Sequence, residues 1–165
     1  MELHVGNLGG TGAAFTERVD AVDTLCELPT EYKALIDGPV SVSLVSQNPN
    51  GSRHHTPVWL GRDDTHVYVT AVRGLPVDRN LRARPEVVLH FIDAAEPDRR
   101  MSMKGVVDQI LDSDQIIRGH PVSTIADQLL PSGVGSVVTP RHDSGEGAIR
   151  TLFRVRPSQL VIFRR

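Results

Sequence analysis

Short apolar runs, several of them alternating with polar residues, divide this chain into segments of strand length. Val40–Ser46 alternates apolar residues with serine, which is the two-residue period of a half-buried strand. The turn signal Asn48–Gly51 follows it. Thr56–Leu60 and His66–Val72 then flank a short polar turn and predict a hairpin. Further runs predict four more strands: Val87–Ile92, Arg100–Leu111 with a bulge or bend at Gly105, Ile149–Val155 and Gln159–Phe163.

Helical patterns are fewer, and most of them are short. Thr30 is placed to N-cap a helix over Glu31–Ile36. Local connections between six or so strands favour an antiparallel barrel over a βαβ fold, and no domain-scale linker interrupts the chain. The other expected elements are helices over Thr16–Glu27 and Pro76–Arg84, a helical stretch over Asp112–Pro131 and a loop over Pro131–Gly147.

The glycine-rich segment Val5–Ala14 has some features of a dinucleotide-binding loop. Such a loop needs a preceding strand and a Gly-x-Gly-x-x-Gly spacing at the N-terminus of a helix. The third glycine is absent after Gly10 and Gly12, and no second βαβ unit follows. Residues 1–15 are therefore expected to form a flexible arm, with an arm that clasps a partner subunit as the alternative.

Composition and charge contribute mainly exclusions. The 165 residues suit one domain, and the net charge of −2 gives no reason to propose nucleic acid as a partner. No apolar run approaches the ~20 residues that cross a bilayer, and no secretory signal pattern is present, so we expect a cytoplasmic protein with no membrane partner. The single cysteine, Cys26, excludes an internal disulfide, and its helical surroundings predict a buried thiol.

Neither a metal site nor a nucleophilic triad is indicated by the sequence. Seven histidines are present, but the adjacent His54 and His55 point to opposite faces of a strand, and no His-x-x-x-His spacing occurs. No serine lies in a Gly-x-Ser-x-Gly elbow. We therefore predict no metal, and no catalytic residue is identified.

Arginines gather between the strands His66–Val72 and Val87–Ile92. A phosphate group needs forked donors and positive charge in one place, which such a cluster can supply. A solvated basic face is the alternative that composition alone favours. The residues concerned are Arg73, Arg79, Arg82 and Arg84.

Four motifs follow one another with a specific order and spacing: Pro57-Val58-Trp59, Tyr68–Thr70, Arg79-Asn80-Leu81-Arg82 with Pro85, and Val87–Phe91. Together they resemble the flavin-binding region of the pyridoxamine 5'-phosphate oxidase-like split β-barrel superfamily, over roughly Leu28–Phe163. The resemblance implies a mainly β (α+β) fold, with residues 16–165 as a single antiparallel split β-barrel domain with flanking helices. It also implies a homodimer with two cofactor sites at the subunit interface.

The activity implied by the resemblance is hydride transfer between bound FMN, or the deazaflavin coenzyme F-420, and a small planar substrate. The cofactor would carry the chemistry, and the protein would bind and orient it. Main-chain groups of the Thr56–Trp59 strand would line the ring, and side-chain donors would hold the phosphate. The implied cofactor-binding residues are His55, Thr56, Pro57, Val58, Trp59, Thr70, Arg73, Arg79 and Asn80.

One departure from the superfamily pattern leaves alternatives open. FMN-binding members usually carry a basic residue three positions before the Asn-Leu pair, and Val77 occupies that place here. Either Arg73 or Arg79 replaces the cation, or the ligand is not FMN. A non-catalytic flavin-, deazaflavin- or haem-binding dimeric module, or a protein without cofactor, is the second hypothesis. A true pyridoxamine-phosphate oxidase is the third, with its substrate phosphate held by Arg150, Arg154, Arg156, Arg164 and Arg165.

Overall fold

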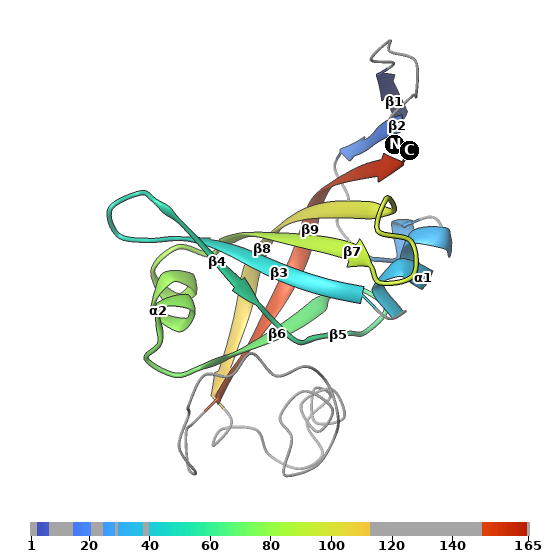
Figure 1. The fold of residues 1–165 in the computed structure, drawn as a ribbon. Helices are drawn as coiled ribbons and strands as arrows, with labels where there is room; N and C mark the ends of the chain where they lie inside the picture. Colours follow the sequence, from blue (N-terminus) through green and yellow to red (C-terminus); the bar gives the residue numbers. More distant parts are fainter. Residues whose placement is uncertain are drawn as a thin grey trace.

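A strongly curved antiparallel sheet with two α-helices makes up the computed structural model (Figure 1). The structure describes residues 3–6, 15–20, 25–28, 30–37, 40–112 and 150–164. Its helical elements are η1 (Leu25–Glu27), α1 (Thr30–Asp37) and α2 (Pro76–Ala83). Its strands are β1 (Leu3–Gly6), β2 (Phe15–Asp20), β3 (Val40–Gln47), β4 (Arg53–Pro57), β5 (Leu60–Arg62), β6 (Val67–Val72), β7 (Glu86–Asp93), β8 (Arg100–Asp112) and β9 (Arg150–Arg164).

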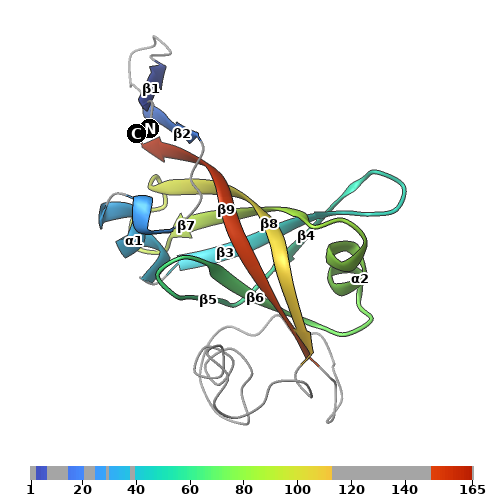
Figure 2. The same cartoon turned by 180° about the vertical axis from the view of Figure 1, so that it is seen from behind.

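The barrel is built from neighbouring antiparallel pairs in the order β4-β3-β7-β8-β9-β6-β5. Strand β9 branches this arrangement, because its first half pairs with β6 and its second half pairs with β2. Strand β8 follows β9 along both halves, as the two long diagonal strands in Figure 2 show. The expected fold, an antiparallel split β-barrel, is confirmed.

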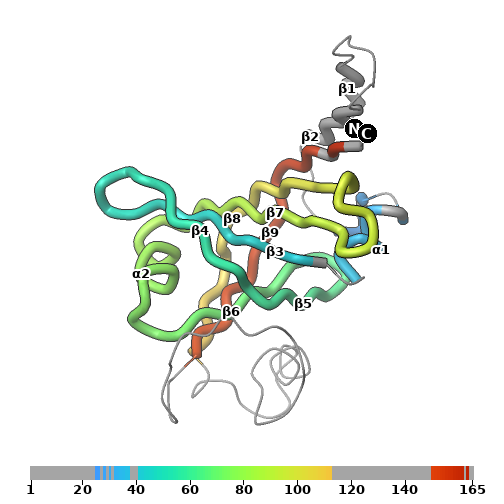
Figure 3. The backbone as a smooth tube through the Cα atoms, in the orientation of Figure 1, coloured from blue at the N-terminus to red at the C-terminus, as the bar shows by residue number. Residues whose placement is uncertain are grey.

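The two edges of this barrel, β4 and β5, are consecutive in the chain. β4 pairs with β3, whereas β5 pairs with β6, and only Val58 and Trp59 connect them. The N–H of Val58 donates to the carbonyl of Val42 at 3.1 Å, which still anchors the connection to β3. Figure 3 shows the chain passing directly from one edge to the other. The prediction of one strand over Thr56–Leu60 is therefore wrong, because the chain changes partner at Val58–Trp59.

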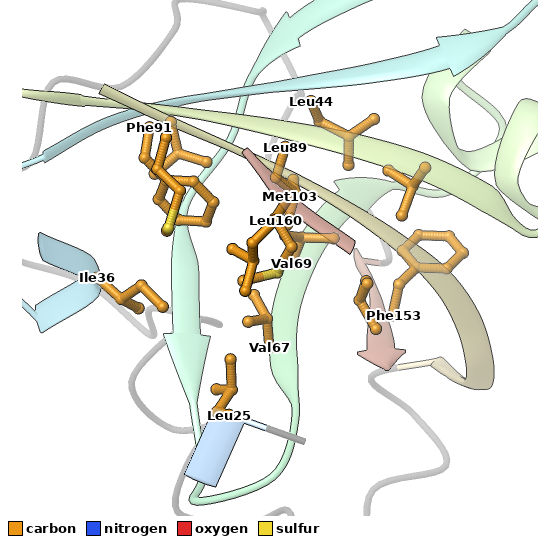
Figure 4. Packing of buried hydrophobic residues seen from close by; sticks show 14 of the residues in the cluster. Leu25, Ile36, Leu44, Val67, Val69, Leu89, Phe91, Met103, Phe153 and Leu160 are labelled. Atoms are coloured by element: carbon orange, nitrogen blue, oxygen red, sulfur yellow. The ribbon is translucent and has the colours of Figure 1, made fainter. Parts of the chain in front are cut away.

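Aliphatic side chains fill the barrel, with a few aromatic and sulfur-containing ones (Figure 4). Alternate residues of the strands point inward, as Leu44, Leu89 and Met103 do with no exposed surface. The two α-helices cover opposite ends of the barrel (Figures 1 and 2). α1 contributes Ile36 and α2 contributes Leu81 to the same core. None of the helices formed by the described residues has the length and apolar character needed to cross a bilayer.

Most of the predicted elements are present. The helices at Thr30 and Pro76 and the strands from Val40, Val87 and Arg100 form within a residue or two of the expected bounds. Gly105 lies at the expected irregularity, where the β8–β9 register shifts between Lys104 and Gly105. A Cβ atom at Gly105 would lie 2.5 Å from Cγ1 of Val155, so the bulge requires a glycine.

Three further predictions from the sequence are wrong. The helix expected over Thr16–Glu27 is replaced by β2 and η1, because pairing with the end of β9 overrides the local pattern. The two strands expected around Arg156-Pro157 form one continuous β9. Pro157 borders a bulge of β9, where Ser158 is the extra residue between the pairs Lys104–Gln159 and Gly105–Pro157, and a proline is tolerated at such a bulge. Cys26 is exposed, and its Sγ contacts the carbonyl of Asp64 at 2.9 Å. The segments expected as a helix over Asp112–Pro131 and a loop over Pro131–Gly147 lie outside the described residues beyond Asp112.

A polar network fixes α2 to the ends of β8 and β9. Arg82 donates to Asp78 (2.9 Å) on its own helix and to Asp112 (2.6 Å) on β8. Thr151 of β9 donates to Asp112 at 2.9 Å and accepts from Arg82 at 3.0 Å. The N–H of Gly74 donates to Asp78 at 2.8 Å. Since both aspartates and Thr151 are buried, this network holds α2 at the open end of the barrel.

We predict that Asp112→Asn destabilises the fold at neutral pH and reduces its sensitivity to acid. Burial opposes ionisation of Asp112, but hydrogen bonds from Thr151 and Arg82 outweigh it, so the pKa of Asp112 lies below its ordinary value. A lowered pKa contributes stability that is present above about pH 4 and is lost as the pH falls through the folded-state pKa. Urea unfolding from pH 7 to pH 3 should show a loss of about 1–3 kcal/mol at pH 7 that shrinks in acid.

The matched control is Asp98→Asn, which changes an exposed aspartate in the turn before β8. That variant should unfold as the wild type does across the whole pH range. Equal unfolding free energies for Asp112→Asn and Asp98→Asn at pH 7 would contradict the role assigned to the network.

Candidate functional site

The residues of the Pro57-Val58-Trp59 motif lie where the chain crosses from one edge of the barrel to the other. Val58 packs against the hydrophobic core. Leu60 is paired with Val69, so the residue before Leu60 falls beside the residue after Val69, which is Thr70. The β5–β6 register, continued by one residue, therefore places Trp59 and Thr70, two of the predicted site residues, next to each other on the face of β6 that points away from the core.

Trp59 has two features that distinguish it from a packing residue. Its Nε1 atom is buried and has no hydrogen-bond partner, the one such side-chain atom among the described residues. Its ring is covered by Arg150, whose Cζ lies 5.4 Å from the ring centroid. An indole N–H without a partner costs about 1–3 kcal/mol, and unpaired buried polar groups are rare in native proteins. A ligand with an acceptor atom would remove this cost.

The β4 residues occupy both faces of their strand. Thr56 lies opposite Leu44 and forms a hydrogen bond of 2.8 Å with Nε2 of His54. His55 and Pro57 alternate with them and are exposed. His55 is close enough to His90 of β7 to help lower the pKa of that residue, after burial, which is the larger cause. The expected opposite orientation of His54 and His55 is confirmed by this alternation.

The connection between β6 and β7, which contains α2 and four arginines, carries less available positive charge than its sequence suggests. Arg82 is held by Asp78 and Asp112, so it is not free to receive a phosphate. Arg73 is half exposed and lies 4.0 Å from Asp112. Arg79 is exposed, and its guanidinium makes no ion pair or hydrogen bond with the described part of the chain. Of these three cations, Arg79 is the one that can take an anion without losing a partner.

Asn80 and Val77 have structural positions on α2. The amide nitrogen of Asn80 donates to Ser46 (3.1 Å) and Asn48 (3.0 Å), so both of its hydrogens bind the β3–β4 hairpin. Val77 is 5% exposed and belongs to the core. The helix position where the superfamily usually carries a cation therefore faces inward here.

A charged cluster covers the outer face of β6, β8 and β9. Arg154 donates to Asp108 at 2.7 Å, and Nε2 of His66 lies 3.1 Å from the same carboxyl group. Tyr68 donates to Asp63 at 2.7 Å. Burial, and then this bond to Asp63, raises the pKa of Tyr68, so the phenol stays protonated. Arg154 is thus neutralised by Asp108, which weakens the hypothesis of a phosphate-binding arginine cluster along β9.

A hollow of about 420 Å³ lies between α1 and the β5–β6 turn, and none of the arginines between β6 and β7 lines it. Leu60, Gly61 and an ion pair between Arg62 and Asp37 line it. Its position does not coincide with the predicted phosphate side. The described residues contain no group of three or more His, Cys, Asp or Glu side chains able to hold a metal ion.

Two groups of predicted residues emerge. Trp59 and Thr70 meet at the β4–β5 crossing, with Thr56 and Pro57 leading into it. Arg73, Arg79 and Asn80 lie on or before α2, which contacts β3, β4 and β6. Arg150 was not among the predicted cofactor ligands. Its signal in the sequence was weak, because it is separated from Trp59 by ninety-one positions and only the β6–β9 pairing brings the two together.

Comparison with known proteins gives a consistent fold. No protein-family profile and no curated protein matches the chain. Among solved structures, an F420 reductase is 23% identical with a TM-score of 0.59, covering 81% of this chain and 98% of its own. HutZ, the haem storage protein of Vibrio cholerae, is 18% identical with a TM-score of 0.56, covering 81% and 92%.

A third similar structure is a protein of Listeria innocua described as a candidate pyridoxamine 5'-phosphate oxidase, 14% identical with a TM-score of 0.56, covering 80% and 94%. All three identities are low, so the likeness concerns the fold. The antiparallel sheet order and the likeness to these neighbours agree on the fold. The chain has the split β-barrel fold that these neighbours share.

Proposed function

We propose that this protein is a flavin- or deazaflavin-dependent oxidoreductase that transfers hydride between bound FMN or F-420 and a small planar substrate. The observation that carries the proposal is the unpaired, buried Nε1 atom of Trp59 at the β4–β5 crossing. Two of the flavin-type motifs, Pro57-Val58-Trp59 and Tyr68–Thr70, belong to this crossing and the neighbouring β6. An unpaired donor there fits a ligand that offers acceptor atoms. The likeness to an F420 reductase supports the same class of ligand.

The protein's own residues would bind and orient the cofactor, which supplies the hydride chemistry when bound. The main chain of Thr56–Trp59 is the expected support for the ring, because β4 ends at Pro57 and β5 begins at Leu60, which leaves Trp59 outside both strands. Arg79 is the expected phosphate ligand, since Arg82 is occupied by Asp78 and Asp112. Asn80 would act through the β3–β4 hairpin that it holds in place.

A non-catalytic binding module is the second candidate. The likeness to the haem storage protein of Vibrio cholerae favours it as specifically as the F420 reductase favours an enzyme. The exposed His55 could serve as an axial ligand for haem iron, because neutral imidazole is a common iron ligand. In either case we place the protein in the cytoplasm and expect a small-molecule ligand.

The absorption spectrum of freshly purified protein, followed by titration with FMN, F-420 and haem, tests the proposed function. We expect a stoichiometric complex with FMN or F-420 and slow or no binding of haem, because the site offers one buried indole donor and arginines. The bound cofactor should be reducible by a nicotinamide or F-420-reducing system. Tight binding of haem with no affinity for FMN or F-420 would instead support the non-catalytic module.

Replacing Arg79 with alanine should weaken binding of FMN or F-420 about 10- to 100-fold, because a charge-assisted hydrogen bond contributes about 1.5–3 kcal/mol. Fluorescence titration measures the dissociation constants. Lys104→Ala is the control, since it removes one positive charge from an exposed side chain on β8. Equal dissociation constants for the two variants would rule out Arg79 as the phosphate ligand.

We also propose a homodimer that persists at micromolar concentration. Ile92 and Phe163 are 41% and 36% exposed and flank Arg100 in one row across β7, β8 and β9. Large apolar side chains gathered on a sheet face indicate an interface, and stable homodimers bury about 2,000 Å² or more. Light scattering should give twice the 18.1 kDa of the chain. Ile92→Lys should shift the equilibrium toward the monomer. A mass of one chain for the wild type at every concentration would disprove the dimer.

A further inference from the structure

The connection between β6 and β7 supplies fewer available cations than its four arginines suggest. Val77 is buried in the core, where the superfamily usually has a basic side chain. Arg82 is neutralised by two carboxylates, and Arg73 is 4.0 Å from one of them. Arg79 and Arg84 are the cations of this connection that form no ion pair or side-chain hydrogen bond with the described part of the chain. A phosphate is normally held by more than one charged or hydrogen-bonding group.

Arg150 lies beside Trp59, at the end of β6. It is the first residue of β9 and is paired with Val72, the last residue of β6. Residues two apart on a strand share a face, so Arg150 lies on the same side of β9 as Leu152, which is paired with Thr70. The guanidinium extends over the Trp59 ring. Trp59, Thr70 and Arg150 therefore form one surface outside the barrel.

The chemistry of this contact leaves the positive charge of Arg150 available. A cation over an indole ring is attracted by the ring quadrupole but is not neutralised, as it would be by a carboxylate. No ion pair of Arg150 with a described residue exists. The forked donors of a guanidinium match the oxygens of a phosphate. Beside it, Nε1 of Trp59 is a further donor with no acceptor.

We infer that Arg150 is the cation that replaces the basic residue missing at Val77. Stacked on Trp59, it binds the phosphate of the planar cofactor, and Nε1 of Trp59 donates to an acceptor atom of the same ligand. The inference rests on the proposed function, because it assigns a residue to the cofactor of that site. It adds a ligand-binding residue from β9 to a site otherwise built from β4 and the β6–β7 connection.

Trp59 makes the test direct, because it is the one tryptophan of the sequence. Its intrinsic fluorescence reports on this site without contribution from another indole. The wild type, Arg150→Ala, Arg150→Lys and the control Lys104→Ala are titrated with FMN and with riboflavin, which has the ring but no phosphate. The same pair of measurements uses F-420 and its phosphate-free deazaflavin riboside.

Arg150→Ala should weaken FMN or F-420 binding about 10- to 100-fold and change binding of the phosphate-free ligand less than about threefold. Arg150→Lys should recover part of the affinity, since it restores charge without the forked donors. Lys104→Ala should behave as the wild type with every ligand. In the absence of ligand, the Arg150→Ala variant should show altered Trp59 fluorescence emission, because the cation over the indole ring is gone.

Two results overturn the inference and differ in what else they affect. If the wild type binds FMN or F-420 and Arg150→Ala retains the wild-type preference over the phosphate-free ligand, Arg150 is not the phosphate ligand and the proposed function still stands. If the wild type binds none of these ligands, both fail. Thermal unfolding monitors folding of the variants, and Arg150→Lys provides the comparison if Arg150→Ala does not fold.

Discussion

The closure of the barrel by two residues is the constraint on which the rest of the structure depends. β4 belongs to one edge of the sheet and β5 to the other, so Val58 and Trp59 must span between them. Val58 packs against the core, which leaves the side chain of Trp59 outside the barrel. The indole of Trp59 is thereby fixed where it has neither a strand partner nor a hydrogen-bond acceptor. The candidate site is a consequence of this change of partner.

The allocation of charge around α2 is a second constraint. Four arginines close together in a sequence do not make an anion site if the fold assigns them carboxylates. Asp78 and Asp112 form ion pairs with Arg82, and these ion pairs hold α2 against the barrel. Arg154 on β9 is occupied by Asp108 in the same way. Arg79 and Arg150 differ because neither has a carboxylate within the described residues, so local sequence density is a poor guide to available charge.

Much of the fold could be predicted because it depends on local patterns. The alternation in Val40–Ser46 and the Pro76 helix start are properties of a few adjacent residues, and both gave the right element. The helix predicted over Thr16–Glu27 was wrong because β2 pairs with residues of β9 that are 139 to 149 positions away in the sequence. The split between β4 and β5 was missed for the same reason, since the run Thr56–Leu60 has no local break. The predicted site residues Trp59 and Thr70 are adjacent, but their binding role stays a prediction.

Strand β9 pairs with β2, β6 and β8, although it lies at the far end of the described chain. Every one of these pairings joins residues distant in sequence, which is the property that slows folding. During synthesis, β8 and β6 must wait with open edges until residues 150–164 have left the ribosome. Exposed strand edges are templates for unwanted pairing. Pairing with β9 therefore protects the edges of β6 and β8 from unwanted pairing in the growing chain.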